Sequence, residues 1–96
     1  MVIGILQVEL RIDDSRSLKD KRRIVRSVKD RLHREHMVSV AEVDLQDNHT
    51  TAVLGIALVS NEVKRTQSVL DSIIEKMKQG RGYYMSDHSV EILTGQ

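Results

Sequence analysis

The chain has 96 residues, of which 40% are hydrophobic and 30% charged, at a net charge of +1; this is typical of one globular domain and not of a disordered chain. No cysteine is present, which excludes disulfides, thiolate metal sites and thiol nucleophiles. Because there are two Tyr and no Phe or Trp, the core must be aliphatic.

The first predicted element is a strand over residues 2–12, where the even-numbered positions are apolar or small and Gln7, Glu9 and Arg11 point the other way. Asp13, Asp14 and Ser15 form a turn. A strand with one buried face is therefore expected to lead into a turn.

A helix follows, because Ser17 stands three residues before Asp20 in a capping arrangement. Its apolar positions fall within an arc of roughly 120° at helical spacing: Leu18, Ile24, Val25, Val28 and Leu32. We expect the helix to pack on a sheet and to end near Glu35 or His36.

Two further strands are predicted over residues 38–43 and 50–60, joined by a polar hairpin loop over residues 44–49. The second of these is apolar on both sides, which suits an interior position. Glu42 and Asp44 in the first, like Glu91 near the C-terminus, suit the edges of a sheet, where charge discourages unwanted pairing.

Ser60 or Asn61 is expected to cap a second helix that ends at Gly80. Its apolar face consists of Val63, Leu70, Ile73, Ile74 and Met77. After a loop over residues 81–87, residues 89–93 are predicted to form the last strand.

The predicted order is strand, helix, strand, strand, helix, strand. Two right-handed crossovers joined by a hairpin give an α+β ferredoxin-like βαββαβ sandwich, with a four-stranded antiparallel sheet and both helices on one face. The chain has no proline, low-complexity run or repeat, so we expect a single domain over residues 1–96.

Basic residues gather on the first helix. Residues 17–36 hold eight basic and three acidic residues, a local net of +5, which leaves −4 for the rest of the chain. Opposite the apolar arc lie Lys19, Arg23, Arg26 and Arg34, with Arg22 and Lys29 beside them. Two interpretations stay open: a surface that binds phosphates of a polyanion, or a solvated helix face partly neutralised through Asp30 and Glu35.

Lys21 differs from the other basic residues because its direction lies inside the apolar arc. It either extends past the edge of the core into solvent or reaches across the loop after the first strand. The sequence leaves both options open.

The uncovered side of the sheet does not resemble the base-stacking surface of an RRM, because the first and third strands carry no aromatic residue. Its outward residues begin with Ile3, Ile5 and Gln7, and Glu91 would add acidic charge, as would Glu42 if it faces outward. Such a mixed apolar and acidic face suits protein contact, and a homodimer through it is an alternative use.

Several chemistries of this architecture are excluded by the sequence. The segment after the first strand holds neither the glycine-rich phosphate loop of acylphosphatases nor a cysteine pair, and no nucleotide-binding or hydrolase motif occurs. No catalytic, cofactor or metal residue is assigned. The weaker alternative is a metal-dependent enzyme in the hairpin loop, built on Asp44, Asp47 and His49 with help from Asp87 and His88.

Four motifs resemble the YlxP-like bacterial proteins, a family of unknown function with a ferredoxin-like fold, and together they cover almost the whole chain. They are Ser17-Leu18-Lys19-Asp20-Lys21-Arg22-Arg23, Val38-Ser39-Val40-Ala41-Glu42-Val43-Asp44, Gln46-Asp47, and Leu54-Gly55 running on to Val59-Ser60-Asn61. Genes of this family often lie near those for transcription elongation, translation initiation and ribosome maturation factors, so the resemblance implies an RNA or ribosome context.

The resemblance also implies contact residues at the basic start of the first helix, which matches Lys19, Lys21, Arg22 and Arg23. One departure lies in the hairpin loop. Family members commonly carry Leu-Trp after Gln-Asp, where this chain has Asn48 and His49. If that Trp contacts a partner, the contact is altered or lost in this chain.

We therefore expect a binding module, not an enzyme, that contacts structured RNA or the ribosome. The expected contact residues are Lys19, Lys21, Arg22, Arg23, Arg26 and Arg34. A protein-interaction or homodimerisation role for the open sheet is the alternative. No stretch is long and apolar enough to span a bilayer, and residues 1–10 lack a secretion signal, so we expect a cytoplasmic protein that needs no cofactor.

Overall fold

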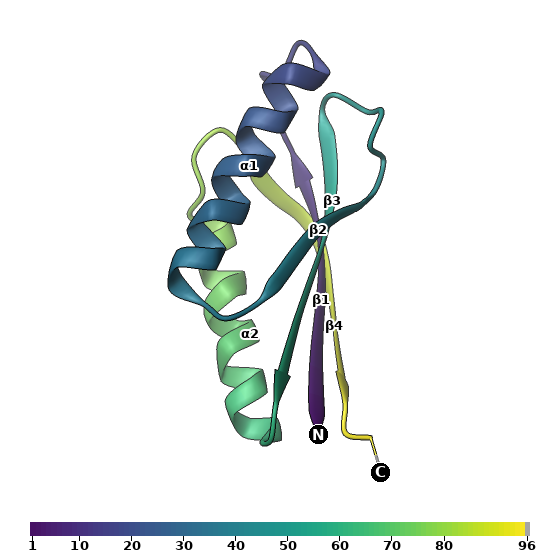
Figure 1. Cartoon of the computed structure of the whole chain (residues 1–96). Helices are drawn as coiled ribbons and strands as arrows, with labels where there is room; N and C mark the ends of the chain where they lie inside the picture. Colours follow the sequence, from purple (N-terminus) through teal and green to yellow (C-terminus); the bar gives the residue numbers. More distant parts are fainter. Residues whose placement is uncertain (96) are drawn as a thin grey trace.

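The computed structural model describes residues 1–95, in which four antiparallel strands form one sheet and two helices cover one of its sides (Figure 1). The elements are β1 (Val2–Arg11), α1 (Leu18–Glu35), β2 (Ser39–Asp44), β3 (Thr51–Ser60), α2 (Val63–Lys78) and β4 (Tyr84–Leu93). This order confirms the predicted ferredoxin-like α+β fold.

The strands lie in the order β2-β3-β1-β4, so the two apolar strands are interior and the two charged strands form the edges, as predicted. The even-numbered residues of β1 face the helices, with Leu6, Val8 and Leu10 fully buried. Residues paired across neighbouring strands share a face, so Ile56 lies beside Leu6 on the covered side. The register of β1 against β3 therefore determines which side chains the open face carries.

Aliphatic side chains from both helices fill the space over this side of the sheet, as the absence of Phe and Trp requires. Helix α1 contributes Val25, Val28 and Leu32, and α2 contributes Leu70, Ile73, Ile74 and Met77. Helix α1 begins as predicted, because the Ser17 hydroxyl accepts a hydrogen bond from the Asp20 amide at 3.1 Å. It ends at Glu35, where the His36 amide donates to the Leu32 carbonyl.

The start of α2 was predicted wrongly by one or two residues. Its N-cap is Glu62, with no side-chain cap, and neither Ser60 nor Asn61 occupies that position. Ser60 is still the last residue of β3, and its hydroxyl accepts a hydrogen bond from the Glu62 amide at 2.9 Å. Because the backbone of Ser60 still belongs to β3, Ser60 does not act as the N-cap of α2. Its side chain instead stabilises the turn before the helix.

The last strand is longer than predicted and begins at Tyr84, so the preceding loop is shorter than residues 81–87. Pairing with β1 decides this: Met85 lies opposite Leu10, and a register shift beside Glu9 absorbs the irregular segment. The ring of Tyr83 occupies the space that a Cβ atom at position 80 would need, and burial raises the pKa of the Tyr83 hydroxyl. Gly80 thus provides room for Tyr83 after a helix that already ends at Lys78.

Lys21 is buried, with 1% of its side chain exposed, although it lies on the most basic helix of the chain. Its Nζ atom donates to the carbonyl oxygens of Leu45 at 2.8 Å and Thr51 at 3.2 Å, both from the β2–β3 hairpin. The Gln46 carbonyl lies 3.4 Å away and a Glu42 carboxylate oxygen 2.7 Å away. Four oxygens surround an ammonium with three protons, and the Glu42 contact is an ion pair outside directed hydrogen-bond geometry.

These contacts correct two predictions. Lys21 reaches neither solvent nor the loop after β1; it is enclosed by the hairpin loop, so its charge is unavailable to a phosphate. Glu42 lies on the helix-covered side of β2 with this lysine and does not add charge to the open face. Both corrections have one cause. A buried charge is stable only where other groups neutralise it, so the buried Lys21 ammonium and the Glu42 carboxylate lie on the same side of the sheet.

Replacing Lys21 with Met should lower the free energy of unfolding by about 2–4 kcal/mol, because Glu42 would lose its counter-ion and three carbonyls their donor. The exposed Lys19→Met, two positions earlier on α1, should change it by no more than about 0.5 kcal/mol. Urea denaturation of both variants measures the difference. Equal stabilities would show that the Lys21 contacts contribute nothing net.

Candidate nucleic-acid interface

Six cationic residues form one exposed surface on α1, which we call the basic face: Lys19, Arg22, Arg23, Arg26, Lys29 and Arg34. Five of them are exposed, and Lys29 is half-buried. The helix turns them outward because its opposite side packs on the sheet through Val25, Val28 and Leu32. Five of the six predicted contact residues thus share this surface, and Lys21 does not.

The basic face has no counter-ions within residues 1–95. Six other basic residues of the chain form salt bridges, among them Lys21, Arg31 and Lys76. None of the six residues of the basic face does so. Asp30 forms a salt bridge with neither Arg26 nor Arg34, although each lies four residues from it along the helix. Only the expected Arg31–Glu35 pair is present, at 3.6 Å.

A hollow of about 320 Å³ runs along the flank of α1 and collects one row of these side chains. We call it the helix hollow; Arg22, Val25, Arg26, Lys29, Asp30 and His33 line it. The helical spacing of Arg22, Arg26, Lys29 and His33 places them in one row. Three cations and His33 therefore border a surface depression together with one carboxylate, Asp30, and the largely buried Val25.

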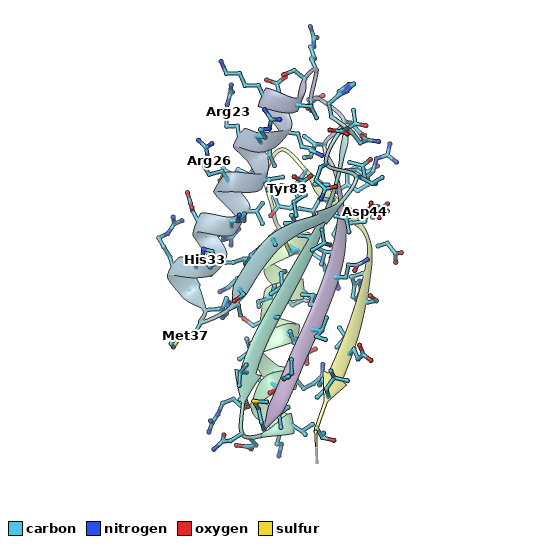
Figure 2. All side chains as sticks on the ribbon, turned by 45° about the vertical axis from the view of Figure 1, so that its right-hand side comes forward. Arg23, Arg26, His33, Met37, Asp44 and Tyr83 are labelled. Atoms are coloured by element: carbon cyan, nitrogen blue, oxygen red, sulfur yellow. The ribbon has the colours of Figure 1, made fainter. Side chains whose placement is uncertain are left out.

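A second hollow, of about 630 Å³, opens where α1 ends; we call it the terminal hollow. Its lining is largely apolar, with Ile3 of β1, Ala57 and Val59 of β3, and Val38 of the α1–β2 linker, beside Met37. His33 lines both hollows, so the terminal hollow lies next to the end of the helix hollow. In Figure 2, Arg23, Arg26, His33 and Met37 follow one another along α1 and its end.

A small polar cluster fixes the end of α1 against α2. The Lys76 ammonium contacts a carboxylate oxygen of Glu35 and lies 2.8 Å from the Nε2 atom of His36. Because an ammonium only donates, Nε2 must accept and His36 is neutral here. Burial, followed by the charge of Lys76, lowers the pKa of His36, and the hydrogen bond from Lys76 lowers the pKa of Glu35.

The open face of the sheet has a different character from the basic face. Its apolar end includes Ile3, Ile5 and Val59, the last with 67% of its area exposed. At the other end a hollow of about 170 Å³ is bordered by Glu9, Asp44 and Asp87, together with Gln7, Leu45, Val53, His88 and Ser89. The chain thus carries a basic surface on its helical side and an acidic one on its sheet side.

The structure separates the residues proposed for a hairpin-loop site. Asp44 borders the acidic hollow with Asp87 and His88, whereas Asp47 and His49 do not line it. The Asp44 carboxylate accepts from the Leu45 amide at 2.8 Å. In residues 1–95 no three His, Asp or Glu side chains are arranged to hold a metal ion.

Asn48, one of the two departures from the family pattern, is used by the loop itself. Its side-chain oxygen accepts hydrogen bonds from the amides of Thr50 at 2.9 Å and Thr51 at 3.0 Å. These bonds form the turn that brings the Thr51 carbonyl to Lys21. Asn48 therefore supports the hairpin structurally.

Sequence patterns alone missed the terminal hollow. His33 could have been recognised, because it continues the helical spacing of Arg22, Arg26 and Lys29. Met37 and Val59 lie 22 residues apart in the sequence, and only the fold brings them together. Met37 gave no signal either, although 98% of its area is exposed.

Lowering the pH below about 6.5 should reduce stability, because the pKa of His36 is lower in the folded chain and the unfolded chain binds the extra proton. The stabilising contribution of neutral His36 is fully present above the ordinary His pKa. It is lost as the pH falls from there through the lower pKa that His36 has in the folded chain. Chemical denaturation between pH 7.5 and 5.5 measures it, above the range where Glu35 titrates. His36→Gln should flatten the dependence; an unchanged slope would contradict the assignment.

Among residues 1–95 no helix combines the length and apolar composition needed to cross a bilayer. Two solved designs share the fold. The de novo designed protein Foldit4 matches with a TM-score of 0.53 and 12% identity over 98% of this chain and 99% of the design. The ferredoxin-fold design LFR1 1 matches with a TM-score of 0.50 and 16% identity over 97% of this chain and 84% of the design. At these identities the likeness concerns the fold alone.

Sequence comparison gives the family. The model of DUF503, a protein of unknown function, matches residues 3–90. The uncharacterized protein YlxP of Bacillus subtilis (strain 168) is 32% identical over 73 residues, which is 76% of this chain and 79% of that protein. The chain therefore belongs to the YlxP-like DUF503 family, as its four motifs indicated.

Proposed function

We propose that this protein is a non-enzymatic module that binds structured RNA, alone or within the ribosome, through the basic face of α1. One observation carries the proposal: within residues 1–95 the chain pairs Lys21, Arg31 and Lys76 with carboxylates but leaves the six residues of the basic face without salt bridges. The contact residues are Lys19, Arg22, Arg23, Arg26 and Arg34, joined by Lys29.

The spacing of these charges disfavours a purely structural explanation. Like charges recur at three- and four-residue intervals, as in Arg22 with Arg26 and Arg26 with Lys29. Such pairs destabilise a helix by about 0.2–0.5 kcal/mol each. A polyanion removes this repulsion and releases counterions of its own, which gives affinity without any base-specific contact.

The open sheet supports a second candidate, association with a protein partner or another copy of the chain. The supporting observation is the apolar end of the face, where Val59 is 67% and Leu93 42% exposed. Burial of such side chains contributes hydrophobic free energy that hardly depends on salt. Salt dependence therefore separates the two candidates.

The test compares the binding of a structured ribosomal RNA fragment by the native chain and by the triple variant Arg22→Ala, Arg23→Ala, Arg26→Ala. If about four phosphates are engaged, the log-log salt dependence should have a slope of roughly −3 to −4. The variant should flatten this slope and bind at least about tenfold more weakly at low salt. Titration at several salt concentrations measures both quantities.

A matched control removes the same number of charges from α2 through Lys64→Ala, Arg65→Ala and Lys78→Ala, all at exposed positions. This variant should bind nearly as the native chain does, and circular dichroism should show that both variants fold. An equal loss of RNA affinity in the two variants would mean that binding depends on the net charge of the chain and not on the position of the charges. Equally poor binding by the native chain and the α1 variant would reject the proposal and favour the open sheet.

A further inference from the structure

The terminal hollow is bordered by the end of β3, which has no neighbouring strand along its outer edge in the described residues. Strand β2 begins at Ser39, opposite Ala57, whereas β3 continues to Ser60. The segment from Leu58 to Ser60 therefore has β1 on one side and no described strand on the other. The backbone groups on that edge remain available to hydrogen-bond a ligand.

Apolar surface borders this free edge. Val38, Ala57 and Val59 lie around the hollow, and Met37 stands beside it with 98% of its area exposed. An unbranched methionine adapts its shape to a flat ligand and contacts aromatic rings favourably. The site thus offers apolar contact to a ring face and hydrogen-bonding groups to a ring edge.

The basic face leads directly to this site. His33 borders both hollows, and the row from Arg22 to His33 is roughly 16 Å long at the α-helical rise per residue. Figure 2 shows Arg23, Arg26, His33 and Met37 in sequence along this flank. A strand whose phosphates lie on the row would reach the hollow at its end.

We propose that the terminal hollow receives one unpaired base of the RNA whose phosphates lie on the basic face. This rests on the proposed RNA-binding function and adds a preference for RNA with an unpaired nucleotide. A base within a duplex is stacked on both faces, whereas an unpaired base presents a face to apolar or aromatic side chains and an edge to hydrogen-bonding groups.

Charge favours this occupant over a second copy of the chain. In a two-fold dimer the same surface of both copies would meet. Joining two terminal hollows in this way would place His33, where each basic row ends, at the interface, and it would supply no carboxylate to Arg26 and Lys29, which have no counter-ions in residues 1–95. A polyanionic strand instead neutralises the row while its base fills the hollow.

The test uses two RNA hairpins that differ in one unpaired nucleotide, a single-nucleotide bulge present in one and absent in the other. The native chain should bind the bulged hairpin about tenfold more tightly, as expected for the stacking of one base. The double variant Met37→Ser, Val59→Ser should lose this preference while keeping the salt slope, because the phosphate contacts remain. The control variant Val63→Ser, which changes an exposed valine outside the hollow, should keep both the preference for the bulged hairpin and the salt slope.

Each alternative outcome has a distinct meaning. Salt-dependent binding of both hairpins with equal affinity would overturn the base site and leave the RNA proposal standing. No binding of either hairpin by the native chain would overturn both. A native dimer in sedimentation that becomes monomeric in the double variant would show that a second copy covers the hollow, and would also overturn the base site.

Discussion

The buried ammonium of Lys21 is the constraint on which the arrangement of α1 depends. A charge excluded from water needs oxygen partners, and all of its partners come from β2 and the hairpin that follows. The first turn of α1 is thereby tied to the sheet in both position and rotation. Because the helix cannot turn about its axis without breaking these contacts, Arg22, Arg23 and Arg26 are directed away from the core.

Charge in this protein is divided between paired and unpaired groups. Lys21 and Lys76 each connect a helix to another element, and both are neutralised by carboxylates, Glu42 and Glu35. The cations of the basic face of α1, in contrast, form no salt bridge within residues 1–95. On the far side of the sheet, Asp44 of β2, Glu9 of β1 and Asp87 of β4 form an acidic end. Under the proposed function, this separation of charge would direct the helical side of the molecule toward a polyanion.

Unequal strand lengths create the terminal hollow. β2 has six residues and β3 has ten, so the end of β3 extends past its edge neighbour. Helix α1 ends close by, and the cluster of Glu35, His36 and Lys76 holds that end against α2. Because β2 is shorter than β3, apolar surface and backbone groups without a neighbouring strand lie next to the last residues of α1.

The sequence by itself determined the fold and the basic side of α1, because strand and helix periodicity, the cap at Ser17 and the clustering of charge are local properties. It could not determine the start of β4, where pairing with β1 overrides a weak local pattern. Tertiary structure alone decided the role of Lys21, whose partners lie 21 to 30 residues away. It also decided that Met37 and Val59 border one hollow, because the folded chain brings near each other residues that no helical or strand period relates.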